Sequence, residues 1–330
     1  MQNRIDWVDQ VKGFAILLVV YGHNFPVTEQ FVYTFHMPLF FMVSGFFFPK
    51  YLNFNLLQKR FKTLMVPYFF WAFFLFAFWI LIGQKMGRSG GEELSASKNF
   101  LGIFYSQGGK EFMDWGIPMW FLPCMFLAYL FYFLLNKYLT QKFVILSVLV
   151  LTFLGFIYGR ISDFDLPWSI NVACVALFFL MIGNLVYPYL SKWNNKWSWF
   201  ILPILFGLQF VLYGFNSKVD MYRSEFGDNE LVLLINGLVG SFATILLFKL
   251  IPYFKPFSII GKYTLLILAL QLLAMAFIKL CLWKGLGVTD FSFSEWEKFF
   301  YSFIQIALIY PVFLVVNYYY PLLNGTSKKI

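Results

Sequence analysis

Charged residues are scarce in this sequence, and histidine and cysteine are scarcer still. Of its 330 residues, 12% are charged, whereas a typical soluble domain has about 25%. Hydrophobic residues make up 60% of the chain, which is more apolar surface than a globule of this size could hide from water. The composition therefore excludes an ordinary soluble protein.

Long apolar runs recur along almost the whole chain, and each could cross a hydrocarbon core about 30 Å thick. We predict an all-α, polytopic integral membrane protein that forms a single transmembrane domain over residues 1–330. About ten transmembrane helices are expected, near residues 10–25, 31–48, 63–84, 116–136, 142–159, 168–190, 198–215, 231–251, 257–281 and 299–319. The expected location is a cell membrane, as a multi-pass protein of the bacterial cytoplasmic membrane surrounded by lipid.

The distribution of charge predicts the orientation, because Lys and Arg concentrate in short cytoplasmic loops. With both termini in the cytoplasm, fourteen of the sixteen acidic residues fall on the outer side, all but Asp6 and Asp9. The same orientation places fifteen of the twenty-five basic residues inside: Arg4, Lys12, Lys50, Lys59, Arg60, Lys62, Lys137, Lys142, Lys192, Lys196, Lys249, Lys255, Lys262, Lys328 and Lys329.

Several functional classes find no support in the sequence. The net charge of +9 lies in loops between apolar segments, whereas a nucleic-acid binder gathers its basic residues on one soluble face. The cysteines, Cys124, Cys174 and Cys281, match no metal-binding spacing, so we expect neither nucleic acid nor a metal. No Gly-x-Ser-x-Gly, Gly-x-Gly-x-x-Gly, Walker or HExxH motif is present.

The two histidines, His23 and His36, both fall in the first predicted hairpin, residues 9–48. Lys12 precedes His23 by eleven residues, which on a helix is three turns and a climb of about 16 Å, so the two share one face. Asp9 lies one turn below Lys12, where an (i, i+3) contact is expected. Ionisable groups within the membrane are costly, so their presence there indicates a function. Imidazole is the side chain best suited to proton transfer near neutral pH.

Other polar groups could bind substrates. Ser44, beside Gly45, is either a helix-packing residue or part of a ligand site, and Gln271 is a polar residue within an apolar run. Trp120, with Trp115 and Tyr105, could form an interfacial aromatic belt or a platform for sugar rings. The basic residues Lys59, Arg60 and Lys62 could set the topology or hold phosphate groups.

A long outer loop is expected over residues 85–115, containing the segment Arg88-Ser89-Gly90-Gly91-Glu92-Glu93. A loop of about thirty residues is unusual and suggests a lid or binding element, although a disordered tether is the alternative. Two segments, 39–45 and 177–183, have similar sequences, but their positions do not fit a repeat of five helices plus five. We attribute the similarity to the small set of apolar residue types from which both segments are built.

The hairpin contains, in order, the patterns Asp9-x-x-Lys12-Gly13, His23, Phe35-His36-Met37-Pro38-Leu39-Phe40-Phe41 and Ser44-Gly45-Phe46. This set resembles the N-terminal signature of the membrane acyltransferase-3 family, in its branch resembling fucose 4-O-acetylases. Further matches are the basic stretch before Pro67-Tyr68, the element Trp120-Phe121-Leu122-Pro123 and the late element Gly261-Lys262-Tyr263-Thr264-Leu265. It departs from the family pattern at Thr63, where a second arginine is common, and at Gln271, where a histidine is common.

The resemblance implies transfer of an acyl group, acetyl first and succinyl as an alternative, from cytoplasmic acetyl-CoA or another acyl-CoA to a hydroxyl of a cell-envelope saccharide or lipid-linked saccharide. It implies His23 as the catalytic imidazole, with His36 as a second candidate, and it places Lys12 and Arg60 on the acyl-CoA side. We predict His23, His36 and Asp9 as catalytic, Lys12, Lys59, Arg60 and Lys62 as donor-binding, and Ser44, Trp120 and Gln271 as substrate-binding.

Two other functions are consistent with the same residues. A proton-coupled transporter or flippase of a lipid-linked saccharide would use His23 and His36 as coupling groups, but the proline interruptions do not pair between two halves of the chain. A catalytically silent assembly component is the third possibility.

Overall fold

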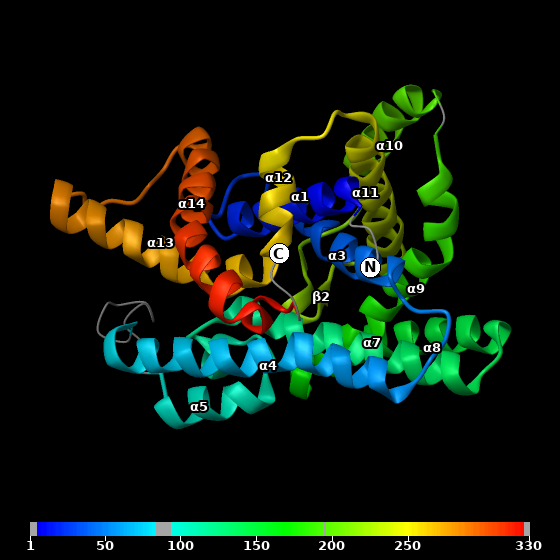
Figure 1. Ribbon diagram of the computed structural model, residues 1–330, viewed down its shortest axis with the longest axis horizontal. Helices are drawn as coiled ribbons and strands as arrows, with labels where there is room; N and C mark the ends of the chain where they lie inside the picture. The colour runs from blue at the N-terminus through cyan, green and yellow to red at the C-terminus, as the bar shows by residue number, and fades with distance from the viewer. Residues whose placement is uncertain (1–4, 84–93, 195, 327–330) are drawn as a thin grey trace. The chain divides into compact units, whose positions relative to one another are not determined.

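The computed structural model describes residues 5–83, 94–194 and 196–326, and their regular structure is almost entirely helical (Figure 1). The prediction of an all-α, polytopic membrane protein is confirmed. Within the described ranges, seven helices are long and apolar enough to cross a membrane: Phe54–Gly83, Ile117–Tyr138, Gln141–Ile161, Pro167–Lys192, Glu230–Leu250, Thr264–Leu286 and Glu295–Tyr319. A total of ten spans and cytoplasmic termini stay predictions.

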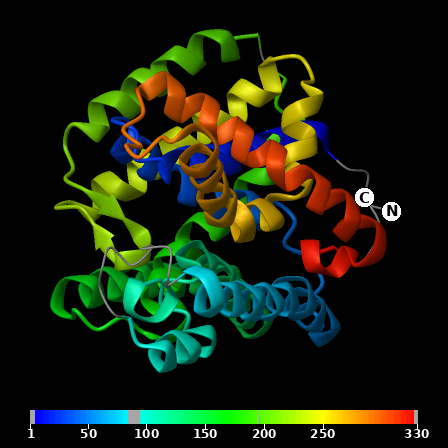
Figure 2. The ribbon, with the colours of Figure 1, turned by 90° about the vertical axis from the view of Figure 1, so that its left-hand side faces the viewer.

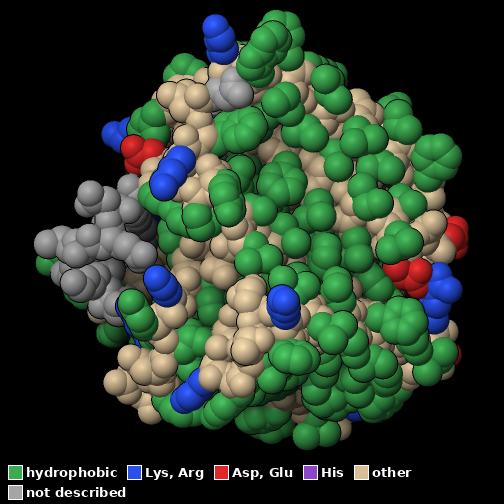
Figure 3. All heavy atoms as spheres, turned by 90° about the vertical axis from the view of Figure 1, so that its right-hand side faces the viewer, with side chains coloured by type: hydrophobic (Ala, Val, Ile, Leu, Met, Phe, Trp, Pro, Cys, Tyr) green, Lys and Arg blue, Asp and Glu red, His purple; other side chains and the backbone are tan. Residues whose placement is uncertain are grey.

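Large apolar side chains are exposed over much of the surface, as expected of a protein whose solvent is lipid. Figure 3 shows one face on which hydrophobic side chains predominate. The helix α8 (Gln141–Ile161) shows the pattern clearly, because Phe143, Leu146 and Phe153 are exposed whereas Val144 and Val148 are buried. One side of this helix therefore packs in the protein and the other faces outward.

The chain divides into two compact units. The first contains residues 5–40, 196–215 and 234–326. Its elements are α1 (Asp6–Gly22), α2 (Glu29–Tyr33), the start of α3 (His36–Phe46), α10 (Ser198–Tyr213), most of α11 (Glu230–Leu250), α12 (Lys255–Lys262), α13 (Thr264–Leu286), α14 (Glu295–Tyr319) and the short helix η6 (Pro321–Asn324). Figure 2 shows α13 and α14 side by side, in orange and red.

The second unit contains the described residues of 41–194 and 216–233. Its elements are the rest of α3, α4 (Phe54–Phe78) with η1 (Trp79–Gly83), α5 (Ala96–Tyr105), α6 (Lys110–Met113), η3 (Ile117–Trp120), α7 (Phe121–Tyr138), α8, η4 (Pro167–Ser169), α9 (Ile170–Lys192), β1 (Val219–Asp220), η5 (Met221–Arg223) and β2 (Glu225–Phe226). The strands form an antiparallel pair that joins Val219 to Phe226 and Asp220 to Glu225.

Two glycines bring α1 and α12 into backbone contact in the first unit (Figure 1). A Cβ atom on Gly13 would lie 2.0 Å from the carbonyl oxygen of Phe257, and one on Gly261 would lie 1.9 Å from that of Asp9. The Gln10 side chain accepts a hydrogen bond of 2.6 Å from the backbone N–H of Phe254. The early and late elements of the family-like pattern thus meet at this crossing.

A second reciprocal crossing joins α3 to α9 in the second unit. A Cβ on Gly45 would lie 2.0 Å from the carbonyl oxygen of Leu180, and a Cβ on Gly183 would lie 1.9 Å from that of Met42. The two apolar segments that look alike in sequence, 39–45 and 177–183, therefore pack on each other. Their likeness has a physical reason, since each supplies one glycine to the same close contact.

The continuous helix predicted over 31–48 is instead divided into α2 and α3, with a turn at Thr34 and Phe35. Pro38 lies in the first turn of α3, where its missing N–H leaves no helical donor for the Thr34 carbonyl, so the helix restarts at His36. The helix predicted over 257–281 is likewise divided at Tyr263, whose ring stacks on Phe313 at 4.2 Å.

Where the structure describes the segment predicted as a long outer loop, most of it is helical. Residues 94–115 contain α5 and α6, and the buried Asn99 donates to the Glu111 carbonyl and accepts from the Asp114 N–H. The Tyr68 hydroxyl donates to the Ile103 carbonyl at 2.7 Å, which holds α5 on α4. The segment Arg88–Glu93 lies outside the described residues.

The glycine crossing of α1 and α12 makes a direct prediction. Gly13→Ala or Gly261→Ala should lower the free energy of unfolding by about 1–3 kcal/mol or more, because each added methyl group overlaps a backbone carbonyl. Thermal unfolding of the purified protein in detergent would measure the loss.

Gly207→Ala is the matched control, because a Cβ at that helical position meets nothing within 4 Å. Alanine should there raise stability slightly through its helix propensity, by up to about 1 kcal/mol. Equal unfolding temperatures for all three variants would contradict this account of the crossing.

Candidate active site

The predicted acid and base on α1 form an ion pair. The Lys12 ammonium lies 3.0 Å from the Asp9 carboxylate, one helical turn away, and Asp9 is buried. The same helix runs unbroken to Gly22 and places His23 at its C-terminal cap. The predicted contact between Asp9 and Lys12 is therefore present, three turns below the imidazole.

His23 lies half-buried at the start of the turn that follows α1. Its backbone N–H donates to the Val19 carbonyl, whereas its ring makes no hydrogen bond with any residue that the structure describes. An imidazole in an apolar setting is favoured in its neutral form. The ring nitrogens of His23 therefore have no partner within the described chain, so one could accept a proton from a bound ligand.

His36 is buried at the first position of α3, and its ring is fixed by two contacts. Its Nδ1 lies 2.9 Å from the Val32 carbonyl oxygen. Because a carbonyl only accepts, Nδ1 carries the proton, and the Nε2 of a neutral ring is left as the acceptor. The Tyr33 ring lies 5.1 Å from that of His36, and Tyr33 also lies against Gly22, just before His23. The two histidine-bearing segments thus share one aromatic neighbour.

Amide side chains hold the turn after His23 to α14. Asn24 donates to the Ser302 hydroxyl at 2.9 Å and to the Gln305 side-chain oxygen at 3.2 Å, and Gln305 donates back to Asn24 at 3.3 Å. Ser302 and Gln305 are buried. These groups depend on one another, because a buried polar group that loses its partner costs free energy.

The same turn contains a strained residue that α14 also holds. Phe25 has φ of 52°, in the left-handed region, which costs a non-glycine residue about 1–2 kcal/mol. The Lys298 ammonium donates to the Phe25 carbonyl at 2.9 Å, and the Glu295 carboxylate accepts from the Val27 N–H at 2.9 Å. Strain maintained by surrounding contacts is common at functional sites.

The predicted donor-binding residues belong to both units. Lys12 lies in the first, and Lys59, Arg60 and Lys62 lie on α4 in the second. Lys59 and Lys62 are exposed, whereas Arg60 is half-buried with its guanidinium carbon 4.8 Å from the centre of the Tyr129 ring. Arg60 is therefore the basic residue of this stretch whose side chain is positioned by packing, and a joint role with Lys12 stays a prediction.

The predicted substrate residues are distributed over three elements. Ser44 is half-buried on α3, next to the Gly45 crossing, and Trp120 is buried at the end of η3. Burial of Trp120 and Trp115 differs from the interfacial belt that would face lipid. Gln271 is buried on α13, and its side-chain oxygen has no partner among the described residues. Roles in substrate binding stay predictions for all three.

The sequence interpretation missed Asn24, Ser302 and Gln305, which surround the turn of the hairpin. The signal available for Asn24 was its position next to His23 in the sequence. Ser302 and Gln305 are spaced (i, i+3) within the hydrophobic stretch 299–316 of α14, and polar groups in such a stretch usually face a partner in the protein. The pairing itself, across 281 positions of the sequence, has no local signal.

Comparison with known proteins gives one match. A family model described as an acyltransferase domain matches residues 5–320, which is nearly the whole chain. Neither the curated proteins nor the solved structures give a match.

The amide pair between the turn and α14 can be tested by its coupling. Asn24→Ala should reduce the free energy of unfolding by about 1–3 kcal/mol, since it leaves the buried Gln305 amide without its partner. Adding Gln305→Ala should cost less than the sum of the two single changes, with a coupling of about 0.5–3 kcal/mol. Denaturation of the four proteins in detergent measures this cycle.

Asn55→Ala serves as the control, because Asn55 is exposed on α4 and should tolerate the change. Strict additivity of Asn24→Ala and Gln305→Ala would show that the pair does not hold the turn.

Proposed function

Because the chain belongs to the membrane acyltransferase-3 family, we propose that it transfers an acetyl group from cytoplasmic acetyl-CoA to a hydroxyl of a cell-envelope saccharide. That it is a multi-pass membrane acyltransferase follows from the family match over residues 5–320 and from the apolar helices. The donor, the acceptor and the residues that act are the proposal. The observation that carries the chemistry is the ring of His23, which has no hydrogen-bond partner in the described part of the chain and lies in a turn held by α14.

In the proposed reaction His23 acts as general base. It takes the proton from the acceptor hydroxyl as the oxygen attacks the thioester carbonyl, so that an O–H bond breaks and an O–C bond forms. The C–S bond then breaks, and the imidazolium returns the proton to the departing CoA thiolate. A positioned proton transfer of this kind typically contributes about 10²–10⁴-fold to the rate.

His36 is the second catalytic candidate. Its bond to the Val32 carbonyl leaves Nε2 as the acceptor of a neutral ring, and Tyr33 fixes the ring plane. Asp9 acts further down α1, where its carboxylate positions and neutralises Lys12. Lys12 in turn offers a positive charge to the phosphate groups of the donor, a task that Arg60, Lys59 and Lys62 would share.

The role of His23 is tested by His23→Gln, which keeps a polar side chain of similar length. Transfer of radiolabelled acetyl from acetyl-CoA to saccharide should fall by at least about 10²-fold, because the glutamine amide at position 23 does not take up a proton near neutral pH. Reconstituted protein with quantified label in the glycan and CoA fractions gives the measurement.

His36→Asn is the informative companion variant, since its amide can still donate to the Val32 carbonyl but has no counterpart of Nε2. Undiminished transfer by His23→Gln would remove the base from the mechanism. If the wild-type protein moved saccharide across the membrane while all label stayed on CoA, the chain would be a transporter instead.

Arg60 gives a separate prediction about the donor. Arg60→Ala should raise KM for acetyl-CoA by about tenfold or more with little change in kcat, because a charge-assisted hydrogen bond to phosphate contributes about 1.5–3 kcal/mol. S-acetyl-pantetheine, which lacks the nucleotide phosphates, should be used equally well by both proteins.

Lys142→Ala is the control, since Lys142 is an exposed basic residue at the start of α8, also expected in the cytoplasm. An equal rise of KM for both donors would indicate that Arg60 supports the fold rather than the phosphates.

A further inference from the structure

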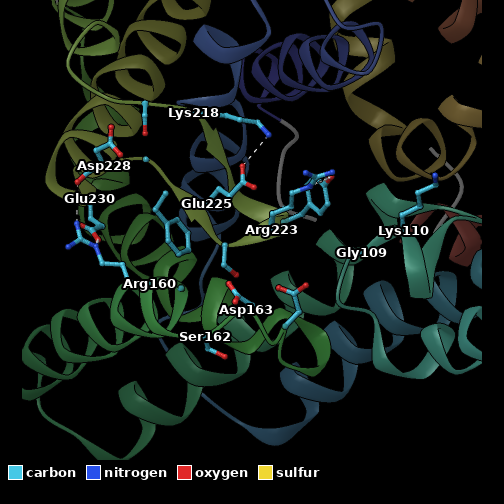
Figure 4. Close-up of a pocket in the computed structure, with 17 residues that line it drawn as sticks. Gly109, Lys110, Arg160, Ser162, Asp163, Lys218, Arg223, Glu225, Asp228 and Glu230 are labelled. Carbon is cyan, nitrogen blue, oxygen red and sulfur yellow. Dashed lines mark hydrogen bonds and ion pairs between the residues drawn. The ribbon is translucent and has the colours of Figure 1, made fainter. Parts of the chain in front are cut away.

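A polar pocket opens in the second unit, formed by three segments that are far apart in sequence (Figure 4). Its volume is about 630 Å³, within the range of small-molecule sites. The loop after α5 contributes residues 109–110, the end of α8 and the loop that follows it contribute 159–165, and the β1–β2 region contributes 217–230. The charge pattern of the sequence predicts all three segments on the outer side of the membrane.

The strand pair that forms one wall is fixed on α8. The Phe226 ring meets Phe156 edge to face, with ring centres 5.0 Å apart. Gly159 allows this approach, because a Cβ there would lie 2.9 Å from the Ser224 carbonyl oxygen. At the base of the strands, Asn216 donates to the Phe226 carbonyl at 3.3 Å and accepts from the Asn229 N–H at 3.0 Å. The wall is therefore positioned before any ligand binds.

The basic residues of the pocket are largely neutralised by acidic neighbours. Arg160 forms an ion pair with Glu230, and Lys218 lies 3.2 Å from Glu225. Arg223 lies 4.0 Å from Asp220, and its Nε donates to the Tyr222 hydroxyl at 2.6 Å. Figure 4 shows Lys218 directed toward Glu225, with Arg160 and Lys110 at opposite ends.

Carboxylates remain after these pairs are formed. Five acidic residues line the pocket against four basic ones, and Asp163 and Asp228 make no ion pair with another described residue. Burial raises the pKa of the half-buried Asp165 carboxyl above its ordinary value, while the Arg223 guanidinium partly opposes that rise. The site thus presents hydrogen-bond acceptors and little surplus positive charge.

These features select among ligands. A phosphate or a uronic acid would place negative charge beside carboxylates that form no ion pair with another described residue, and like charges repel. The basic residues would offset little of this repulsion, because most of them already have acidic partners. Hydroxyl and amino groups can instead donate to the free carboxylate oxygens. The Tyr222 ring, which rests against Gly108, adds an aromatic surface for the apolar face of a sugar ring.

We infer that this pocket binds the saccharide acceptor and that it prefers neutral or amino sugars over acidic ones. The identification of the ligand as the acyl acceptor rests on the function proposed above, whereas its chemical class rests on the pocket. Asp163 and Asp165 accept hydrogen bonds from the hydroxyl or amino groups, and Tyr222 supports one ring.

Three trisaccharides that differ mainly in charge test the inference with the full-length protein in lipid nanodiscs. Cellotriose is neutral, the trimer of glucosamine is cationic, and trigalacturonate is anionic. Saturation-transfer NMR and calorimetry should detect binding of the first two and at least about tenfold weaker binding of the third. Asp163→Asn with Asp165→Asn should weaken cellotriose binding by about tenfold or more, because hydrogen bonds to ionised acceptors are replaced by weaker ones.

Asp290→Asn is the matched control, since Asp290 is an exposed acidic residue in another segment predicted on the outer side. Absence of binding by all three sugars, preference for trigalacturonate, or unchanged binding in the double variant would each overturn the inference. Hydrolysis of acetyl-CoA and labelling of saccharide, followed in parallel, separate the two proposals. Intact transfer without selective binding rejects the pocket alone. Selective binding without any transfer rejects the proposed reaction and the identification of the ligand as its acceptor, but keeps the chemical class of ligand assigned to the pocket.

Discussion

The close packing of α1 on α12 is the constraint on which the position of α1, and with it that of His23, depends. In a membrane, helices gain little from hydrophobic burial against one another, so close backbone approach and polar contacts decide how they pack. Gly13 and Gly261 permit that approach, and Gln10 adds a hydrogen bond to the backbone ahead of α12. Since α1 is a continuous helix from Asp6 to Gly22, fixing its lower turns also fixes the height and direction at which His23 emerges.

The upper end of the hairpin is held by a different kind of contact. Asn24, Ser302 and Gln305 form a polar group in which each member satisfies another, and the Phe25 backbone is retained in a costly conformation by contacts from α14. An amide cluster of this kind is directional, whereas apolar packing is not. It can therefore fix the orientation of a turn while the neighbouring His23 ring has no hydrogen-bond partner among the residues that the structure describes. A general base must be positioned and still be free to accept a proton, and this arrangement is consistent with the role proposed for His23.

The class, the approximate positions of seven spans and the Asp9–Lys12 contact could be predicted, because each follows from composition, periodicity or local spacing, and the family could be predicted from its motifs. Sequence reasoning missed the breaks at Phe35 and Tyr263, since the apolar run continues through both and only Pro38 marks one of them. It treated the likeness of 39–45 and 177–183 as incidental, although Gly45 and Gly183 serve one crossing. The hydrogen bonds of Asn24 to α14 and the pocket of the second unit both bring together residues that are far apart in the sequence. No pattern within a single segment predicts such pairings.

An imidazole base by itself does not distinguish a sugar hydroxyl from water, which has a similar O–H group and is far more abundant. Selective transfer therefore depends on holding the acceptor near the thioester, and well-oriented groups reach effective concentrations of about 10⁵–10⁸ M. On this argument, base strength sets how fast any hydroxyl can react, while acceptor binding decides whether the chain acts as a transferase or as a thioesterase. Under the roles proposed above, acceptor selectivity would depend on Asp163, Asp165 and Tyr222, and proton transfer on the histidines.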